Sequence, residues 1–369
     1  MRVGLDARTL ASSVRSGVEH YVANLVRAFA TFEDGPEIIA YVDRPIADPQ
    51  LSAAASSGIV RTEVVRAKRG WLRAALPFRL WRDGVEIVHL PSTLIPPILP
   101  CPAVVTVHDL AWLHYPEAYD PADLRMQTQV VPRSIRRAAY VIAVSQSTAD
   151  DISRHFDISK DRIAVTPLGV SAAFSPDGPG IEDLLPQADK LASGFILHTG
   201  GHHPRKNLPR LLQAYAVLKD EMPEAPPLVI TGDATSSTVR GLRADAKSLG
   251  MLDSLIFPGE LDEAIMARLY RSATVAVYPS LYEGFGLPII EAMASGIPVV
   301  TSNRSSMPEV AGDAALLVDP ERPDELAAAL KRLLSEPDLR AELIAKGISR
   351  SHEFTWDRTA RQTLELLLL

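Results

Sequence analysis

The chain has 369 residues, 47% of them hydrophobic and 22% charged, an ordinary globular composition whose length predicts two domains rather than one small core. Its net charge of −7 gives no overall positive field to attract nucleic acid, so no nucleic-acid partner is expected. The single cysteine, Cys101, excludes an intramolecular disulfide and favours a reducing compartment.

Short β-type runs alternate with longer helical patterns along most of the chain, such as the helix expected from Val18 to about Thr31. The runs of the first half are Val3–Leu5, Ile38–Val42, Ile59–Val65, Glu86–Leu90, Ala103–Val107, Tyr140–Val144 and Arg162–Thr166. The runs of the second half are Phe195–His198, Leu228–Thr231, Leu255–Phe257, Thr274–Tyr278, Val299–Thr301 and Leu316–Val318. This alternation predicts an α/β fold of two doubly wound parallel sheets facing a cleft, with ligands beyond the carboxyl ends of the strands.

The domain boundary is expected in the Pro- and Gly-rich region 175–192, which resembles a linker. A first domain is therefore expected over residues 1–180 and a second over 190–354. The last segment, 355–369, has an amphipathic helical pattern and is expected to pack back on the first domain. No signal-peptide pattern and no run of roughly 18 apolar residues is present, so we expect a cytoplasmic protein.

The strongest candidate site lies in the stretch Tyr278–Val300. A β-type run leads into a loop with Glu283 and Gly286, and Pro288 suits the first turn of the helix that follows. A strand, a glycine-rich loop and a helix N-terminus direct backbone N–H groups toward a phosphate. Seven residues separate Glu283 from Glu291, and two carboxylates that accept hydroxyl pairs indicate a phosphate between two hydroxyl-rich groups. The alternative is an ordinary turn with two solvated glutamates.

A second candidate is a glycine-rich, basic segment after the run Phe195–His198. Gly200 and Gly201 are followed by Arg205 and Lys206, just before a predicted helix. Arginine offers phosphate a planar fork and lysine a point charge, although an exposed basic turn would have the same sequence.

Two motifs are missing from the sequence. It has no Asp-x-Asp pair for a metal-bound nucleotide, so Arg205 and Lys206 would neutralise a leaving phosphate and no metal or other cofactor is expected. His202 and His203 have no further ligand at metal-binding spacing. The sequence also lacks Gly-x-Gly-x-x-Gly, which weakens the case for a dinucleotide oxidoreductase.

Three loops of the first half follow predicted strands. Gly17 precedes a helix and either approaches a ligand closely or makes a simple turn. His108 lies directly after an apolar strand, where it can donate to a sugar hydroxyl or lie beside a leaving phosphate. Ser145 resembles a helix N-cap. His89 and His114 are interpreted as structural.

The segment 61–82 is locally basic and carries aromatic residues. Its basic residues are Arg61, Arg66, Lys68, Arg69, Arg73, Arg79 and Arg82, and its large apolar residues are Trp71, Leu72, Leu76, Phe78 and Trp81. Such segments often lie on anionic membrane surfaces, so peripheral contact with the inner face of the plasma membrane is one expectation. The alternatives are a solvated helix face and a rim that binds an anionic acceptor.

Together these residues resemble the retaining glycosyltransferases of family four, which have the two-domain GT-B fold. The resemblance spans essentially the whole chain. Its motifs are Glu283 and Glu291 with Gly284–Pro288 between them, Gly200 and Gly201 followed by Arg205–Leu208, Ser305–Ala315, and Thr106–Leu110. The last two look like mannosyltransferase-like members of the family.

The resemblance implies roles for these residues. Arg205 and Lys206 would bind the donor diphosphate, Glu291 the ribose, Glu283 the donor sugar and His108 its hydroxyl edge. The residues expected to act in transfer are His108, Arg205, Lys206 and Glu283. Those expected to bind the donor are Gly17, Gly200, Arg205, Lys206, Phe257 (near the nucleobase), Gly284, Phe285, Gly286, Leu287 and Glu291. Retention in the family is ascribed to same-face attack, which needs positioning and charge stabilisation but no covalent nucleophile.

The leading hypothesis is therefore a retaining glycosyltransferase that moves a hexose, mannose from GDP-mannose above all, onto a glycan or lipid-linked saccharide. The first domain would bind the acceptor and the second the nucleotide-sugar. A UDP-sugar-dependent GT-B enzyme and a sugar-nucleotide epimerase are the enzyme alternatives. From another class, a non-catalytic nucleotide-sugar-binding protein remains open.

Overall fold

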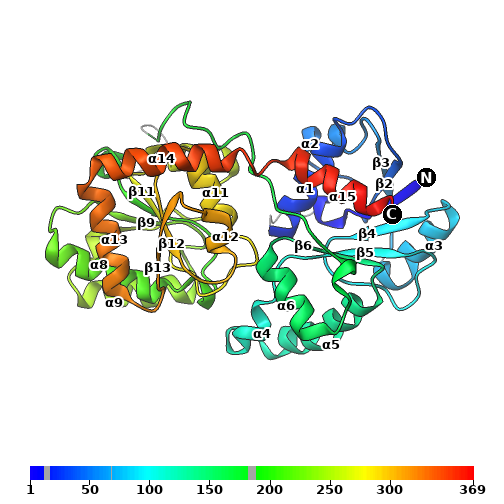
Figure 1. Cartoon of the computed structure of the whole chain (residues 1–369), viewed down its shortest axis with the longest axis horizontal. Helices are drawn as coiled ribbons and strands as arrows, with labels where there is room; N and C mark the ends of the chain where they lie inside the picture. Colours follow the sequence, from blue (N-terminus) through cyan, green and yellow to red (C-terminus); the bar gives the residue numbers. More distant parts are fainter. Residues whose placement is uncertain (12–16, 68, 182–187) are drawn as a thin grey trace. The chain divides into compact units, whose positions relative to one another are not determined.

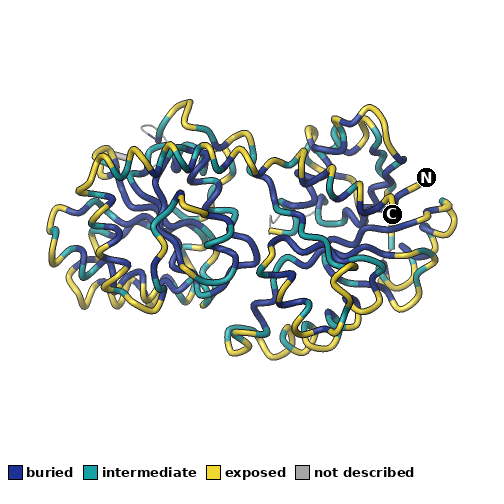
Figure 2. The backbone as a smooth tube through the Cα atoms, in the orientation of Figure 1, coloured by how far each residue is buried: buried dark blue, intermediate teal, exposed yellow. Residues whose placement is uncertain are grey.

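The computed structural model describes residues 1–11, 17–67, 69–181 and 188–369, and divides them into two compact units (Figure 1). The first unit is Met1–Gly169 together with Thr355–Leu369, and the second is Val170–Phe354. In each unit the strands form the buried centre and helices and loops the exposed surface (Figure 2). Within the described residues, no helix is both long and apolar enough to cross a membrane.

The first unit is built on a seven-stranded parallel sheet of order β3-β2-β1-β4-β5-β6-β7. The strands are β1 (Arg2–Asp6), β2 (Glu37–Val42), β3 (Val60–Val64), β4 (Ile87–Leu90), β5 (Ala103–Val107), β6 (Tyr140–Ala143) and β7 (Ile163–Val165). The helices are η1 (Arg8–Ala11), α1 (Gly17–Phe29), α2 (Pro49–Ala54), η2 (Trp71–Ala75), α3 (Leu76–Arg82), α4 (Ala111–His114), η3 (Pro116–Ala118), α5 (Pro121–Arg137), α6 (Gln146–Phe156), η4 (Lys160–Arg162) and α15 (Trp356–Leu367).

Both faces of this sheet are covered. On one face alternate strand residues such as Ile39 and Val105 pack with Leu80 of α3, Ile135 of α5 and Ile152 of α6. Helix α15 packs against α1 and β4, and Figure 1 shows α1 and α15 on the side of the sheet opposite α5 and α6. Burial on both faces explains why these strands are nearly continuous apolar runs.

The C-terminal helix belongs to the first unit, as predicted. Thr355 caps it by accepting from Arg358 N, and the Thr359 hydroxyl donates to the carbonyl of Pro167 at 2.7 Å. Gly169 lies so close to this helix that a Cβ there would be 2.2 Å from Trp356 N, so only glycine fits. Glycine at position 169 thus lets the segment after β7 lie against the start of α15.

The second unit has a six-stranded parallel sheet of order β10-β9-β8-β11-β12-β13. Its strands are β8 (Ile196–His198), β9 (Leu228–Ile230), β10 (Leu255–Ile256), β11 (Val275–Tyr278), β12 (Val299–Ser302) and β13 (Ala315–Val318). Its helices are α7 (Ala188–Leu191), η5 (Pro204–Lys206), α8 (Leu208–Glu221), α9 (Ser237–Ser248), η6 (Leu252–Ser254), α10 (Glu263–Ser272), α11 (Leu287–Ala294), α12 (Met307–Ala311), α13 (Pro323–Ser335) and α14 (Pro337–Ser351). Each run predicted from the sequence matches a strand, and the two differ by at most one residue at either end.

The boundary between the units differs from the predicted end of the first domain at residue 180. Residues 170–181 belong to the second unit because helix α10 holds them. Arg268 donates to the carbonyl of Gly180 at 2.5 Å, and Arg271 to that of Pro179 at 3.1 Å. The Ser171 hydroxyl donates to Glu263 at 2.8 Å. The proline- and glycine-rich segment up to residue 181 is therefore packed against the second unit. Residues 182–187, also part of the predicted linker, lie outside the described residues.

Candidate active site

The two strongest sequence candidates follow neighbouring strands of the second sheet. Strands β8 and β11 pair in parallel, so their carboxyl ends meet at one edge of the sheet. The loop after β8 carries Arg205, and the loop after β11 begins at Pro279. A backbone hydrogen bond of 2.7 Å from Leu281 N to the carbonyl of Arg205 joins the two loops. Segments about 80 residues apart in the sequence therefore form one site.

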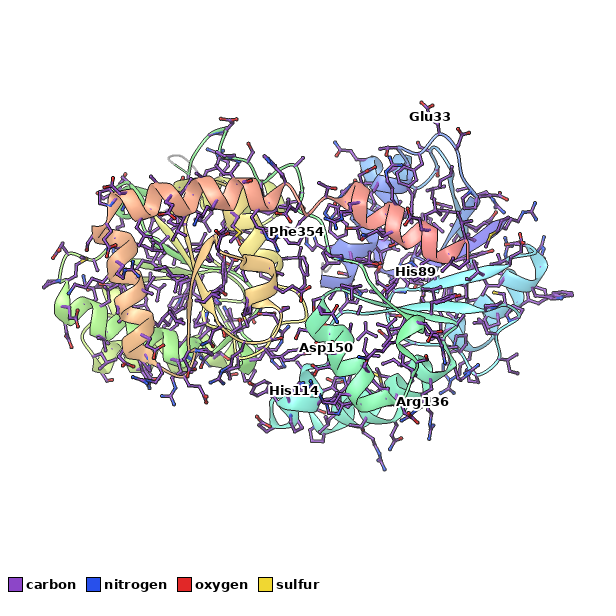
Figure 3. All side chains as sticks on the ribbon, in the orientation of Figure 1. Glu33, His89, His114, Arg136, Asp150 and Phe354 are labelled. Carbon is purple, nitrogen blue, oxygen red and sulfur yellow. The ribbon has the colours of Figure 1, made fainter. Side chains whose placement is uncertain are left out.

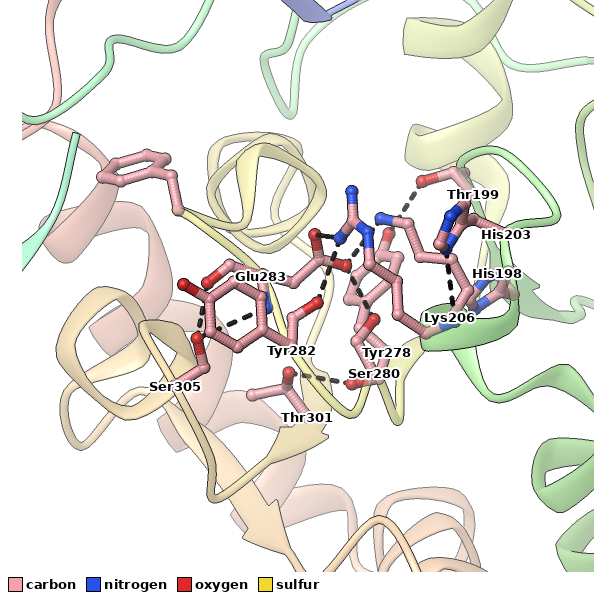
Figure 4. Close-up of polar contacts among 12 residues, drawn as sticks. His198, Thr199, His203, Lys206, Tyr278, Ser280, Tyr282, Glu283, Thr301 and Ser305 are labelled. Carbon is pink, nitrogen blue, oxygen red and sulfur yellow. Dashed lines mark hydrogen bonds and ion pairs between the residues drawn. The ribbon is translucent and has the colours of Figure 1, made fainter. Parts of the chain in front are cut away.

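Glu283 lies at the centre of this site, between two cations (Figure 4). Lys206 Nζ donates to Oε1 at 2.6 Å, and the Ser280 hydroxyl donates to the same oxygen at 2.7 Å. Arg205 Nη1 donates to Oε2 and also, at 3.0 Å, to the carbonyl of Tyr282. The side chains of Arg205, Lys206 and Glu283 are only 17%, 12% and 11% exposed, so solvent screens them little.

These neighbours set the charge of Glu283. Burial would raise the pKa of this carboxyl, but Lys206 and Arg205 outweigh it and lower the pKa to about 2. Glu283 is therefore ionised at neutral pH, and the three side chains together carry one net positive charge. That surplus suits an anionic ligand without leaving two unbalanced buried cations.

Asn207 fixes the basic loop to its neighbours. It has a left-handed backbone, with φ of 61°, and is nearly buried. Its Nδ2 donates to the carbonyl of Pro279 at 3.0 Å and to that of Pro320 at 2.7 Å. Because both acceptors lie beside strand ends, Arg205 and Lys206 are held in place by a buried side chain that the sequence analysis did not single out.

The loop that carries Glu283 is fixed by two serines. The hydroxyls of Ser305 and Ser306 donate to the carbonyl of Glu283 at 2.6 and 2.8 Å, and Ser306 also donates to the carbonyl of Phe285 at 2.7 Å. In the sequence these serines stood out only through the family resemblance.

Helix α11 begins directly after this loop, at Leu287. Gly286 precedes it with φ of 110°, a conformation that favours glycine. Among the described residues no side chain caps this helix, so the backbone N–H groups of its first turn are suited to bind an anion. The predicted residues Gly284 and Phe285 lie in the same loop, and Gly200 borders Lys206 across the site.

Glu291, on the second turn of α11, accepts a hydrogen bond of 3.1 Å from the hydroxyl of Tyr270. Tyr270 also contacts the hydroxyls of Tyr278 and Thr199, at 2.9 and 2.6 Å. Burial raises the pKa of Glu291 to about 7; the Tyr270 bond lowers it, and the charge of Glu263 raises it. Glu291 therefore titrates near neutral pH. Nothing in the sequence pointed to Tyr270.

The histidines of the basic loop have structural partners. Buried His198 donates from Nδ1 to the carbonyl of Val277 at 2.9 Å, and burial lowers its pKa to about 4. His202 donates from Nε2 to the carbonyl of Thr231, and its Nδ1 lies 2.9 Å from the Ser236 hydroxyl. Phe257, predicted near the nucleobase, follows β10 and has the guanidinium of Arg243 5.0 Å from its ring centre. Its role in base binding stays a prediction.

In the first unit, a cavity of about 350 Å³ lies at the carboxyl ends of β1, β2 and β4. It is lined by Asp6, Arg8, Thr9, Val18, Glu19, Val22, Asp43, Pro91, Ser92 and Leu94. Arg8 forms a two-point ion pair with Asp6, at 2.7 and 2.9 Å, and its guanidinium lies over the ring of Trp71. Neither Asp6 nor Arg8 was predicted from the sequence as a site residue.

His108 and Gly17 also belong to the first unit. His108 Nε2 donates to the carbonyl of Pro91 at 3.0 Å, and burial lowers the pKa of the ring, so it is neutral at pH 7. Its ring proton is thus used, and the remaining nitrogen, Nδ1, can accept from a sugar hydroxyl rather than donate to one. Gly17 is the exposed first residue of α1; the loop before it, including Ser16, lies outside the described residues.

Three other polar residues of the first unit were interpreted as structural, and each has a hydrogen-bond partner in the structure. Ser145 caps α6 by accepting from Thr148 N at 3.1 Å. His89 bonds the Thr106 hydroxyl at 2.8 Å. His114 lies 2.9 Å from Asp151, which links α4 to α6; with His155 these form a group whose ligand atoms lie within 4.8 Å of one another.

The basic segment 61–82 is less basic than its sequence indicates, because carboxylates neutralise part of it. Glu63 pairs with both Arg61 and Arg79, and Arg61 also pairs with Glu37. Trp71 and Leu76 are buried, whereas Phe78 and Trp81 are 58% and 68% exposed. The rings of Phe78 and Trp81 contact each other, with centres 6.0 Å apart and planes tilted by 41°. Lys68 lies outside the described residues. Two aromatic side chains of this segment are therefore exposed, and its contact with a membrane stays a prediction.

Comparison with known proteins identifies the chain as a glycosyltransferase. A family model described as "Glycosyl transferases group 1" matches residues 187–350, and one described as "Glycosyltransferase Family 4" matches residues 15–174. O-antigen chain mannosyltransferase B of Escherichia coli is 35% identical over 301 residues, which are 79% of this chain and 76% of that protein. The serotype-specific mannosyltransferase WbdA of Escherichia coli is 31% identical over 272 residues, 72% of this chain but only 33% of WbdA.

Solved structures share the fold. The structure of HepE from Anabaena in complex with UDP-glucose is similar with a TM-score of 0.76, at 19% identity, covering 100% of this chain and 99% of that chain. Two doubly wound parallel sheets of this kind form the GT-B fold, which these structures share. The chain belongs to glycosyltransferase family 4.

Proposed function

We propose that the chain is a retaining mannosyltransferase that moves mannose from GDP-mannose to a glycan or lipid-linked saccharide acceptor. The observation that carries this proposal is the Arg205–Glu283–Lys206 cluster beside the N-terminus of α11. Its surplus positive charge suits a sugar-linked diphosphate. The names of the relatives, an O-antigen chain mannosyltransferase and WbdA, support mannose as the sugar and a saccharide chain as the acceptor.

In the proposed reaction the second unit binds the donor. Arg205 and Lys206 hold the diphosphate, Glu291 accepts from the ribose hydroxyls, and Glu283 contacts the sugar. The bond between the anomeric carbon and the diphosphate oxygen breaks as the acceptor oxygen attacks from the same face. The proton of the acceptor hydroxyl passes to the leaving diphosphate, whose new charge the two cations stabilise. No metal takes part, and EDTA should leave the rate unchanged.

The first unit would bind the acceptor in the cavity at the ends of β1, β2 and β4. Asp6 and Arg8, at the wall of this cavity, offer a carboxylate and a guanidinium to saccharide hydroxyls. His108 would accept from a hydroxyl of the donor sugar through Nδ1. This assignment of the two units is part of the proposal.

Thermal unfolding with GDP, UDP, GDP-mannose and UDP-glucose tests the donor. A nucleotide present at ~100 times its dissociation constant adds roughly 2.7 kcal/mol of stability, so a true ligand raises the midpoint clearly. Stabilisation by GDP compounds and α-linked mannose on a saccharide acceptor are expected. A rise of the melting midpoint with UDP compounds alone would indicate a UDP-sugar donor. Conversion of the sugar without an acceptor would indicate an epimerase. Tight donor binding with neither transfer nor hydrolysis would indicate a binding protein.

We also propose that the first unit contacts the inner face of an anionic membrane through Phe78 and Trp81. Their exposed, adjacent rings lie on α3 beside Arg82, and aromatic and basic side chains together bind headgroup surfaces. Co-sedimentation with anionic vesicles should fall several-fold in a Phe78→Ser, Trp81→Ser double variant. Leu249→Ser, at an exposed apolar residue of the second unit, is the control. Equal sedimentation of both variants would contradict membrane contact.

A further inference from the structure

An apolar groove of about 710 Å³ runs along helix α5 in the first unit. Its lining residues on α5 are Met126, Val130, Arg133, Ser134, Arg136 and Arg137, most of which fall on one helical stripe. Leu72, Arg73 and the loop Leu94–Pro97 form the rest. The volume is within the range of small-molecule sites, roughly 300–1,000 Å³.

Hydrogen bonds hold the groove open. Ser134, at its floor, accepts from Ile95 N at 3.0 Å. Arg137 donates to the carbonyls of Pro96 and Pro97 at 3.0 and 3.1 Å. These bonds attach the loop to α5 on a fixed path, so a ligand would find the groove preformed rather than having to order a loop.

The rim of the groove is cationic. Arg73, Arg133, Arg136 and Arg137 line it, and no carboxylate is part of its lining. In the described part of the chain, none of these four arginines forms an ion pair, in contrast to nearby Arg79, which pairs with Glu63 and Asp83. Arg136 is labelled in Figure 3. An apolar wall beside guanidinium groups that have no carboxylate partner among the described residues matches a ligand with an apolar chain and an anionic end.

The groove adjoins the cavity at the strand ends of the same unit. Leu94 lines both, so one molecule can occupy the cavity with one part and the groove with another. The cavity offers hydrogen-bonding groups for a saccharide, and the groove offers both arginines and apolar side chains. Together the two sites match a molecule that has a sugar, an anionic group and a hydrocarbon chain.

We infer that the groove binds the phosphorylated lipid end of the acceptor, an apolar chain carrying a phosphate or diphosphate next to the saccharide. Arg133 and Arg73 bind the phosphate, and Leu72, Met126 and Val130 contact the chain. This inference rests on the proposed transfer to a lipid-linked saccharide and names the part of the first unit that recognises the lipid.

Binding of farnesyl diphosphate to the full chain, below its micelle concentration, tests the inference. Inorganic diphosphate and farnesol serve as its two separate halves. Arg133→Glu and Met126→Asp should each weaken binding of farnesyl diphosphate about tenfold or more, since each removes one half of the recognition. Arg125→Glu, the same charge change at an exposed residue of α5 outside the groove, should change it less than about twofold. Met126 is 40% exposed and Arg133 is exposed, so both variants should keep the wild-type melting midpoint.

Three outcomes would overturn the inference. The first is equal binding of farnesyl diphosphate by wild type, Arg133→Glu and Met126→Asp. The second is binding of farnesol as tight as that of farnesyl diphosphate, with no effect of Arg133→Glu. The third is an effect of both variants on anionic vesicles but not on monomeric farnesyl diphosphate, which would make the groove a membrane contact. Stabilisation by GDP, measured in each variant, reports separately on the second unit and on the proposed donor.

Discussion

The ammonium group of Lys206 lies 2.6 Å from a carboxylate oxygen of Glu283, a residue 77 positions later in the sequence. The other oxygen of Glu283 contacts Arg205. The cations proposed to bind a diphosphate are thus already balanced in part by an internal carboxylate. Glu283 holds the two cations in place and would also compete with the proposed diphosphate for them. Its substitution should therefore change stability and nucleotide binding in distinguishable ways.

Glu283→Gln should lower the free energy of unfolding by about 3 kcal/mol, because two scarcely exposed cations lose their carboxylate partner. Added GDP should recover more stability in this variant than in wild type, since the diphosphate supplies the missing negative charge. Mannosyl transfer should fall by at least about a hundredfold. Chemical denaturation with and without GDP measures the first two effects, and a transfer assay the third.

Glu336→Gln is the matched control for this substitution. Glu336 pairs with Arg332 at 3.1 Å, but both side chains are about half exposed. Removal of such a pair should cost less than about 1 kcal/mol and should not depend on GDP. If Glu283→Gln proves as mild as Glu336→Gln, the buried ion cluster is not a determinant of stability.

Asn207 allows a test of how the basic loop is held. Asn207→Gly keeps the left-handed backbone but loses the bonds to Pro279 and Pro320, so it should cost about 2 kcal/mol. Asn207→Ala loses the same bonds and adds the strain of alanine at positive φ, about 1 kcal/mol more. Equal midpoints for the two variants in urea denaturation would contradict the strain argument.

The parallel strands were predictable because both of their faces are buried. A run such as Ala103–Val107 has one polar residue, Thr106, and is otherwise apolar, and each predicted run matches a strand whose ends differ from it by at most one residue. The pairing of β8 with β11 is consistent with the predicted doubly wound sheet, and it places Arg205 and Lys206 beside Glu283.

The polar supports of the site were not predictable in the same way. Tyr270 lies in α10, and no local pattern distinguishes it from a core tyrosine; its contact with Glu291 arises only from tertiary packing. Asn207 directly precedes α8 but does not cap it with its side chain, which instead bonds carbonyls 72 and 113 positions away. The boundary near 180 was misplaced because proline and glycine indicate a turn but not which unit binds it.

Glu291 should make stability and donor binding depend on pH in opposite directions. The pKa of this carboxyl is about 7 in the folded chain against an ordinary 4.5, so the folded state holds the proton more tightly between these values. Its contribution to stability therefore falls as the pH rises from about 4.5 through about 7, by at most about 3 kcal/mol. Glu291→Gln should remove this fall and be more stable than wild type at pH 8. Unfolding curves at pH 5 and pH 8 check the sign.

Nucleotide affinity should show the reverse trend if Glu291 accepts from the ribose hydroxyls. The carboxylate is the better acceptor, so the affinity of wild type for GDP should fall as the pH drops below about 7. In Glu291→Gln the affinity for GDP should be weak and should not change with pH over this range. Titration calorimetry between pH 5.5 and 8 measures both, and a pH dependence retained in Glu291→Gln would assign it to another group.

Tyr270→Phe tests whether the neighbouring hydroxyl tunes this carboxyl. The Tyr270 hydroxyl donates to Glu291 at 3.1 Å and lowers the pKa of that carboxyl, so its loss should raise the pKa and move the acid limb of GDP binding to higher pH. Tyr278→Phe is the matched control, because it removes a hydroxyl from the same buried group of Tyr270, Tyr278 and Thr199 but leaves the Tyr270–Glu291 bond. Both variants should lose about 1 to 2 kcal/mol of stability. Only Tyr270→Phe should shift to higher pH the range in which the affinity for GDP falls. A limb that moves equally in both would mean that the buried network as a whole, rather than one hydrogen bond, sets the charge of Glu291.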